Sequence, residues 1–245
     1  MRDLVYLSDN KMRALIPQLP GQLRRRLGFE AGINVGVVSA TATLPSEPQP
    51  SSIALLDAVV EMIEQEKRSL RRTDSDLRSG DWIQFEEEFR YGDAATAAYL
   101  PPDQIAGHPL SGLVYFAAPA GAPFVLCGSS VHVLDRWQSA NPTVKQVGYF
   151  YLDAILAYAR QLAELPDEAA ATEFTPPAEP GRSLSYGLKH LCEIDVRDDQ
   201  RNGWATRPVW LKGHARVLAV VPAYVPGGPP GVLATPLYVE YAQRG

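Results

Sequence analysis

The sequence predicts a single α+β domain over residues 1–245, with a mostly antiparallel sheet and packed helices. Segments with the β-branched or alternating pattern of strands are spread along the whole chain. Two segments carry the 3.6-residue period of amphipathic helices. These elements do not follow one another in a regular βαβ rhythm, which favours an antiparallel sheet over a doubly wound parallel one.

The first half of the chain is expected to begin with a short strand and a helix. Ser8 and Asp9 can cap that helix, and Pro17 should end it, because proline cannot donate a backbone hydrogen bond. Apolar residues then recur at helical spacing after residue 52. The expected elements are strands over 4–7 and 82–91, one or two strands over 27–44, and helices over 11–16 and 52–70.

The second half of the chain is expected to contain paired strands separated by helices. Ser129 is expected to cap a short helix, with a nucleophilic Ser129 or Cys127 as the alternative. The stretch 166–181 is rich in proline and reads as a linker or surface crossing. The expected strands are 113–118, 124–127, 209–221 and 231–241, and the expected helices are 130–137, 147–165 and 183–191.

The amino-acid composition indicates which broad class of protein this is. Hydrophobic residues make up 46% and charged residues 21% of the 245, which is typical of a globular protein. The longest apolar run, 112–125, is broken by proline and glycine and is too short for a membrane helix. The N-terminus has no signal-peptide pattern. We therefore expect a cytoplasmic protein with no membrane partner.

The net charge and the spacing of the cysteines limit the classes of partner and ligand that the chain is expected to bind. The net charge of −5 argues against nucleic acid as the main partner, because phosphate binding needs a basic face. Cys127 and Cys192 have neither CxxC nor zinc-finger spacing. We expect two buried thiols, with a disulfide left open. No metal site and no cofactor is identified, and a protein partner or a homodimer stays open.

Two segments of the chain resemble each other. One begins at Trp82 and the other at Trp210, and each leads through a turn containing Gly and Pro into a Val-Leu pair. This similarity predicts repeat halves, 1–165 and 182–245, joined by the Pro-rich 166–181. Chance similarity between short apolar strands is the alternative.

Side-chain alternation indicates a candidate binding site on the two Trp-led strands. Successive strand residues point to opposite faces, so the even positions of 82–91 and of 209–217 share a polar face. Aligning Trp82 with Trp210 sets Glu86 against His214 and Glu88 against Arg216. The predicted ligand-binding residues are Glu86, Glu88, Arg90, Lys212, His214 and Arg216.

These residues allow three functional interpretations and one structural one. They can form a groove that binds a small anion, for example a nucleotide, in a binding or regulatory module. Alternatively, Glu86 and Glu88 hold a divalent metal in a phosphohydrolase or transferase, or the chain is a protein–protein adaptor. The structural interpretation is a solvated sheet face with ion pairs. Whether the chain is an enzyme stays open.

Two resemblances follow from particular segments. Glu86-x-Glu88-x-Arg90 resembles the Glu-x-Glu-x-Lys strand of triphosphate-tunnel enzymes, with Arg in place of Lys and a position in mid-chain. The segments 4–11, 125–134 and 233–240 resemble an uncharacterised family of actinobacterial proteins with a Tyr-Leu-Ser-Asp start. That family resemblance implies neither an activity nor a catalytic residue.

Overall fold

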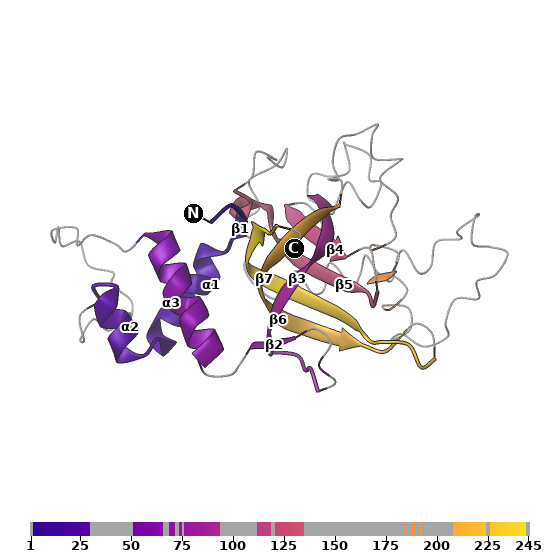
Figure 1. Cartoon of the computed structure of the whole chain (residues 1–245), viewed down its shortest axis with the longest axis horizontal. Helices are drawn as coiled ribbons and strands as arrows, with labels where there is room; N and C mark the ends of the chain where they lie inside the picture. Colours follow the sequence, from indigo (N-terminus) through magenta and orange to yellow (C-terminus); the bar gives the residue numbers. More distant parts are fainter. Residues whose placement is uncertain are drawn as a thin grey trace. The chain divides into compact units, whose positions relative to one another are not determined.

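The structure is a computed structural model in which two compact units are described (Figure 1). One unit comprises residues 8–69, and the other comprises residues 1–7 and 70–245. Within them the structure describes residues 2–29, 51–65, 69–71, 74, 76–93, 112–118, 121–134, 185, 188–189, 192, 208–223 and 226–243.

The smaller unit is helical. It contains α1 (Asp9–Leu15), the short 3-10 helix η1 (Ile16–Gln18), α2 (Gly21–Arg26) and α3 (Ser52–Gln65). The apolar stripe of α3 is buried, as its period predicted, and α1 packs against α3. An ion pair of 2.6 Å between Arg26 and Glu61 joins α2 to α3. The α-helix α1 ends before Pro17, as predicted, but the Ser8 side chain makes no capping hydrogen bond.

The larger unit is built on a closed β-barrel. Its strands are β1 (Leu4–Leu7), β2 (Ser69–Arg71), β3 (Trp82–Asp93), β4 (Leu113–Ala118), β5 (Phe124–Ser129), β6 (Val209–Val221) and β7 (Gly231–Tyr241). The ring runs β3-β4-β5-β7-β6 and closes because β6 pairs with both β7 and β3. The β5–β7 pair is parallel, and the other four pairs in the ring are antiparallel. Outside the ring, β1 adds to β7 and β2 lies beside β3.

The predicted α+β class is therefore wrong: the described chain is mostly β, with a closed five-stranded barrel and few short helices. Local patterns identify strands, but ring closure depends on which strands pair. Here the closing pairs join β3 to β6 and β5 to β7, across more than a hundred residues of sequence. Nothing in a strand's own alternation specifies so distant a partner.

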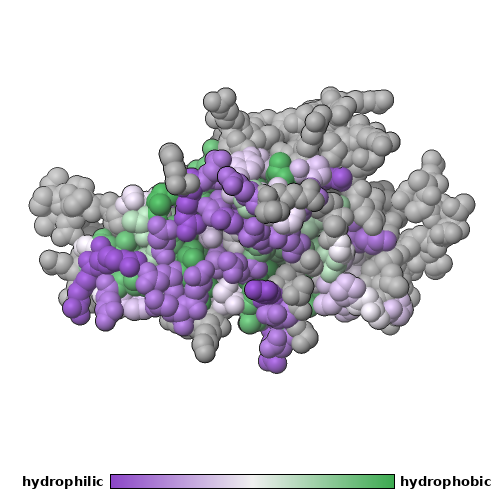
Figure 2. Space-filling model, in the orientation of Figure 1, coloured by the Kyte–Doolittle hydropathy of each residue, from purple (hydrophilic) through white to green (hydrophobic). Residues whose placement is uncertain are grey.

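The barrel interior is filled by aromatic side chains. The rings of Phe85, Phe89 and Phe124 meet edge to face, with centroids 5.4–5.9 Å apart. Gly213 on β6 leaves room for this cluster, since a Cβ there would lie 2.8 Å from Phe85 Cζ and would also strike the Tyr238 carbonyl. Hydrophilic residues predominate on the described part of the face drawn in Figure 2. Alternate apolar side chains of β3 and β6 are directed into the barrel, whereas β4 and β5 are buried at every position.

Most strand predictions are confirmed. Two predictions for the segment directly after β5, a helix and its cap, are wrong. Strands 4–7, 113–118, 209–221 and 231–241 have the predicted bounds, and β3 and β5 each extend two residues further. The helix predicted over 130–137 is wrong: only Ser130–His132 form a 3-10 turn, η2, before the chain becomes extended at Val133. Ser129 makes no side-chain cap there.

Other predictions fall partly or wholly outside the described residues. Ser185, Leu188 and Lys189 are helical, as predicted for 183–191. The helix over 147–165 and the Pro-rich 166–181 lie outside the described residues, as does most of 27–44. The repeat halves 1–165 and 182–245 stay a prediction.

Candidate functional site

The polar side chains of β3 and β6 point away from the barrel core. At odd positions, Phe85 and Phe89 on β3 and Leu211 and Ala215 on β6 are buried in the core. At even positions, the side chains of Gln84, Glu86, Lys212 and Arg216 are exposed to solvent. Alternation in the sequence therefore assigned these residues to the correct faces.

The two strands are neighbours, but the predicted residue pairs are wrong. They run antiparallel, so that Glu86 lies opposite Lys212 and Glu88 opposite Trp210. Further along, Gln84 faces His214, and Arg216 faces Trp82. Aligning one tryptophan with the other treated the strands as if they ran in the same direction. Antiparallel pairing reverses one of them and moves every partner.

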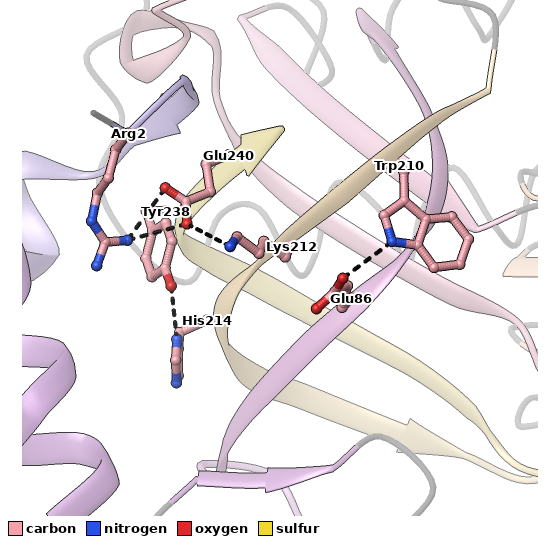
Figure 3. Close-up of polar contacts among 7 residues, drawn as sticks. All are labelled: Arg2, Glu86, Trp210, Lys212, His214, Tyr238 and Glu240. Atoms are coloured by element: carbon pink, nitrogen blue, oxygen red, sulfur yellow. Dashed lines mark hydrogen bonds and ion pairs between the residues drawn. The ribbon is translucent and has the colours of Figure 1, made fainter. Parts of the chain in front are cut away.

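A buried carboxylate on β7 connects β6 with the N-terminal segment that precedes β1. Arg2 Nη1 donates to both carboxylate oxygens of Glu240 at 3.3 Å, and Lys212 Nζ lies 3.6 Å from Glu240 Oε1 (Figure 3). The side chain of Glu240 is only 9% exposed, whereas that of Lys212 is 46% exposed. The Arg2 guanidinium also lies 5.1 Å from the ring centroid of Tyr238. Glu240 is thus shared by residues from the N-terminal segment and from β6.

Sequence analysis missed Arg2, Tyr238 and Glu240. A signal for Glu240 was present, because it is the only charged residue in the strand 231–241. A single charge in an otherwise uncharged strand indicates either a specific partner or an exposed end of the strand. The partners themselves could not be predicted, because Arg2 lies at the other end of the sequence.

His214 is buried on the outer side of the barrel, where it contacts Tyr238. The side chain is 1% exposed, and Nδ1 lies 3.2 Å from the Tyr238 hydroxyl (Figure 3). Burial, and then the positive charge of Arg2, lower the pKa of His214 from 6.5 to about 4. The imidazole is therefore neutral at pH 7. At that pH His214 cannot supply the positive charge expected of it in an anion site.

Arg216 is held by the loop that precedes β3. Its Nε donates to the Gly80 carbonyl at 3.2 Å, and the Gly80 N–H donates to the Val217 carbonyl at 2.9 Å. Gly80 has a φ of 96°, a left-handed conformation that favours glycine. The loop therefore orients the guanidinium of Arg216 through Nε, while the side chain remains exposed.

Of the remaining predicted residues, Glu86 and Glu88 lie opposite β6, and Arg90 lies opposite β4. Glu86 Oε1 accepts a hydrogen bond of 3.3 Å from Trp210 Nε1 (Figure 3). Glu88 lies opposite Trp210 and is half-buried. Arg90 lies one residue beyond the β3–β6 pairing, opposite Ala117 of β4. The structure thus brings five of the six predicted residues into the paired stretch of β3 and β6, whereas Arg90, also on β3, lies opposite β4.

Neither a metal site nor a membrane-spanning helix is found in the part of the chain that the structure describes. Within those residues, no group of three or more His, Cys, Asp and Glu side chains is arranged to hold a metal ion. Glu86 and Glu88 have no third such ligand beside them there. None of the described helices combines the length and the apolar character needed to cross a membrane.

Fold and surface together define a closed five-stranded β-barrel protein with a polar outer face on β3 and β6. The chain belongs to DUF7019, a family of unknown function, whose match covers residues 2–243. The resemblance to an uncharacterised family is confirmed at that level, and its actinobacterial source and Tyr-Leu-Ser-Asp start stay predictions. Neither the curated proteins nor the solved structures contain a match to the chain.

The polar face differs from the ligand face of one well-known group of small barrels. OB-fold barrels bind oligonucleotides on the face of their second and third strands. The second and third strands of this ring are β4 and β5, and all their residues are buried. The exposed polar surface belongs instead to β3 and β6, so barrel architecture alone indicates no ligand here.

Proposed function

We propose that this protein is a small-anion-binding or regulatory module whose ligand is bound by Arg216, with Lys212 adding positive charge on the same strand. The proposal is carried by the anchored guanidinium of Arg216. Its Nε is used by the Gly80 carbonyl, which leaves the two Nη groups as donors in a fixed orientation. A planar fork of this kind suits the paired oxygens of a phosphate or carboxylate.

Lys212 supplies the second positive charge. It lies four residues before Arg216 on the same face of β6, a separation of about 13 Å along the strand. Its Nζ has three donors, and its contact with Glu240 is a long one of 3.6 Å. Both side chains are exposed, so a ligand can reach them without rearrangement of the barrel.

Neighbouring carboxylates limit the affinity of this surface. Glu86 lies directly opposite Lys212, and Glu240 already shares the charge of that lysine. An incoming anion must therefore compete with, or repel, nearby negative charge. The proposal accordingly implies weak binding that decreases as salt is added.

A thermal-shift titration with phosphate and pyrophosphate tests the proposal. A ligand at about 100 times its Kd stabilises the folded state by about 2.7 kcal/mol, which raises Tm measurably. The stabilisation should be lost in Arg216→Ala and reduced in Lys212→Ala. Arg24→Ala, at an exposed arginine of α2, should retain it.

Two other outcomes of the titration would favour a different function. No shift with either anion in the wild type contradicts anion binding and leaves the protein–protein adaptor as the remaining hypothesis. A shift that requires magnesium or manganese would instead favour the metal-dependent enzyme, with Glu86 and Glu88 as ligands.

A further inference from the structure

The loop that precedes β3 carries a second arginine next to Arg216. Residues 78–81 form a β-turn, in which the Asp81 N–H donates to the Arg78 carbonyl at 3.2 Å. The two ends of such a turn are less than about 7 Å apart. Gly80, inside the turn, holds Arg216 through its carbonyl, and a Cβ at Gly80 would lie 3.8 Å from Arg216 Nη2. The Arg216 guanidinium therefore lies on the turn itself, close to where the side chain of Arg78 begins.

The turn is fixed to the barrel by bonds that do not involve the guanidinium of Arg78. The Val217 N–H donates to the Asp81 carbonyl at 2.8 Å, and the Ser79 hydroxyl donates to the Leu218 carbonyl at 2.8 Å. The Arg78 N–H donates to Asp81 Oδ2 at 2.7 Å. The Arg78 side chain is exposed, and its guanidinium has no hydrogen bond or ion pair with another described residue. The turn thus presents this guanidinium to a ligand.

The number of available donors favours a ligand group with three oxygens. Because Nε of Arg216 is bound to Gly80, only its Nη1 and Nη2 groups can bind a ligand. The two oxygens of a carboxylate are sufficient for that pair of donors. A terminal phosphate has three oxygens and can accept from a second guanidinium at the same time.

The charges of the turn favour a doubly negative ligand group. Arg78 and Arg216 together carry two positive charges, which repel each other when no anion lies between them. The Asp81 carboxylate adds one negative charge, but its Oδ2 accepts from the Arg78 N–H inside the turn. A dianion can offset both guanidinium charges, whereas a monoanion offsets only one of them.

We infer that the ligand bound at Arg216 carries a phosphate monoester group, and that this group is held between Arg216 and Arg78. The inference rests on the proposed anion-binding function and adds the second arginine and the charge of the ligand group. Lys212 lies about 13 Å from Arg216 along β6, so it does not contact the same phosphate.

Calorimetric titration at pH 8 with methyl phosphate and with dimethyl phosphate tests the inference. At this pH the monoester is a dianion and the diester a monoanion. Methyl phosphate should bind the wild type about fivefold more tightly, because one further exposed charge pair is formed. Arg78→Gln retains the backbone bonds of the turn and should remove this preference. Arg78→Lys should retain part of the preference, and Arg24→Gln, the control on α2, all of it.

Several outcomes would overturn the inference. If the wild type binds both esters equally well, or if the preference survives in Arg78→Gln, the role of Arg78 is wrong while the proposed anion site stands. The same conclusion follows if Arg78→Gln weakens both esters by the same factor, or if only pyrophosphate binds. If pyrophosphate and both esters fail to bind, the proposed function and this inference are both wrong.

Discussion

The ring of Tyr6 packs directly against the Cα of Gly128. A Cβ at position 128 would lie 2.7–2.8 Å from the carbon atoms Cζ and Cε2 of that ring and would also strike its hydroxyl oxygen. Tyr6 is 1% exposed, and its ring meets Phe116 edge to face. Backbone contacts between Tyr6 and Val133 hold β1 on the opposite side from β7. The N-terminal strand is therefore fixed to the barrel through this close contact.

Gly128→Ala should destabilise the protein by about 1–3 kcal/mol, because the added methyl group overpacks a buried ring. Urea unfolding at neutral pH measures the change. Gly21→Ala is the matched control, since a Cβ there meets nothing within 4 Å and alanine favours the helix. Restoration of stability by combining Gly128→Ala with Tyr6→Leu would confirm the contact, and equal effects of the two glycine substitutions would contradict it.

Protein stability should fall as the pH is lowered from 6.5 to about 4. In this range His214 takes up a proton in the unfolded chain but stays neutral in the folded protein, because its folded pKa is lowered to about 4. The unfolded state then binds more protons, and protonation favours it by about 3 kcal/mol once the pH reaches 4. Above pH 6.5 both states are neutral, and the contribution of His214 no longer changes with pH.

Urea unfolding across this pH range, in wild type and in His214→Leu, measures that contribution. The leucine variant should lose most of the slope between pH 6.5 and 4, whatever its stability at neutral pH. Tyr238→Phe retains the imidazole and removes only the hydroxyl contact, so it should keep much of the slope. An unchanged slope in His214→Leu would show that other groups dominate the acid response.

Glu240→Gln should cost about 1–3 kcal/mol in stability at low salt. The substitution keeps the shape of the side chain but removes the charge shared by Arg2 and Lys212. Added salt should reduce the difference between variant and wild type, because Arg2 and Lys212 are partly exposed. A coupling energy near zero in the double-mutant cycle of Arg2→Ala with Glu240→Gln would show that the ion pair contributes nothing.

Glu86→Gln should strengthen anion binding by a few fold, up to about fivefold. It removes the negative charge opposite Lys212 and retains an oxygen that can accept the Trp210 N–H. Isothermal titration with pyrophosphate measures the change, and Glu64→Gln on α3 is the control. Weaker binding in Glu86→Gln would mean that Glu86 takes part in recognition, as the metal-dependent alternative requires.

Local patterns were sufficient to predict the strands of the barrel ring and their two faces, but not β2 (Ser69–Arg71), which the helix predicted over 52–70 overlaps. The alternation of Phe85 and Glu86, or of Leu211 and Lys212, reports directly which side of a strand is buried, because successive side chains point in opposite directions. The bounds of β6 and β7 followed from the Gly and Pro residues that separate them. The same reasoning wrongly extended a helix over 130–137, because a serine at a strand end is not by itself a cap.

The chain alone determined where strands form, which side chains face the core, and where Pro17 ends α1, because these depend on neighbouring residues. Only the tertiary structure decided that β3 and β6 run antiparallel, that the ring closes, and that Glu240 lies between Arg2 and Lys212. It also decided that His214 stays neutral well below pH 6.5, because burial and the charge of Arg2 lower its pKa to about 4. Such properties arise from contacts between residues far apart in sequence, and no local pattern encodes their distance or their surroundings.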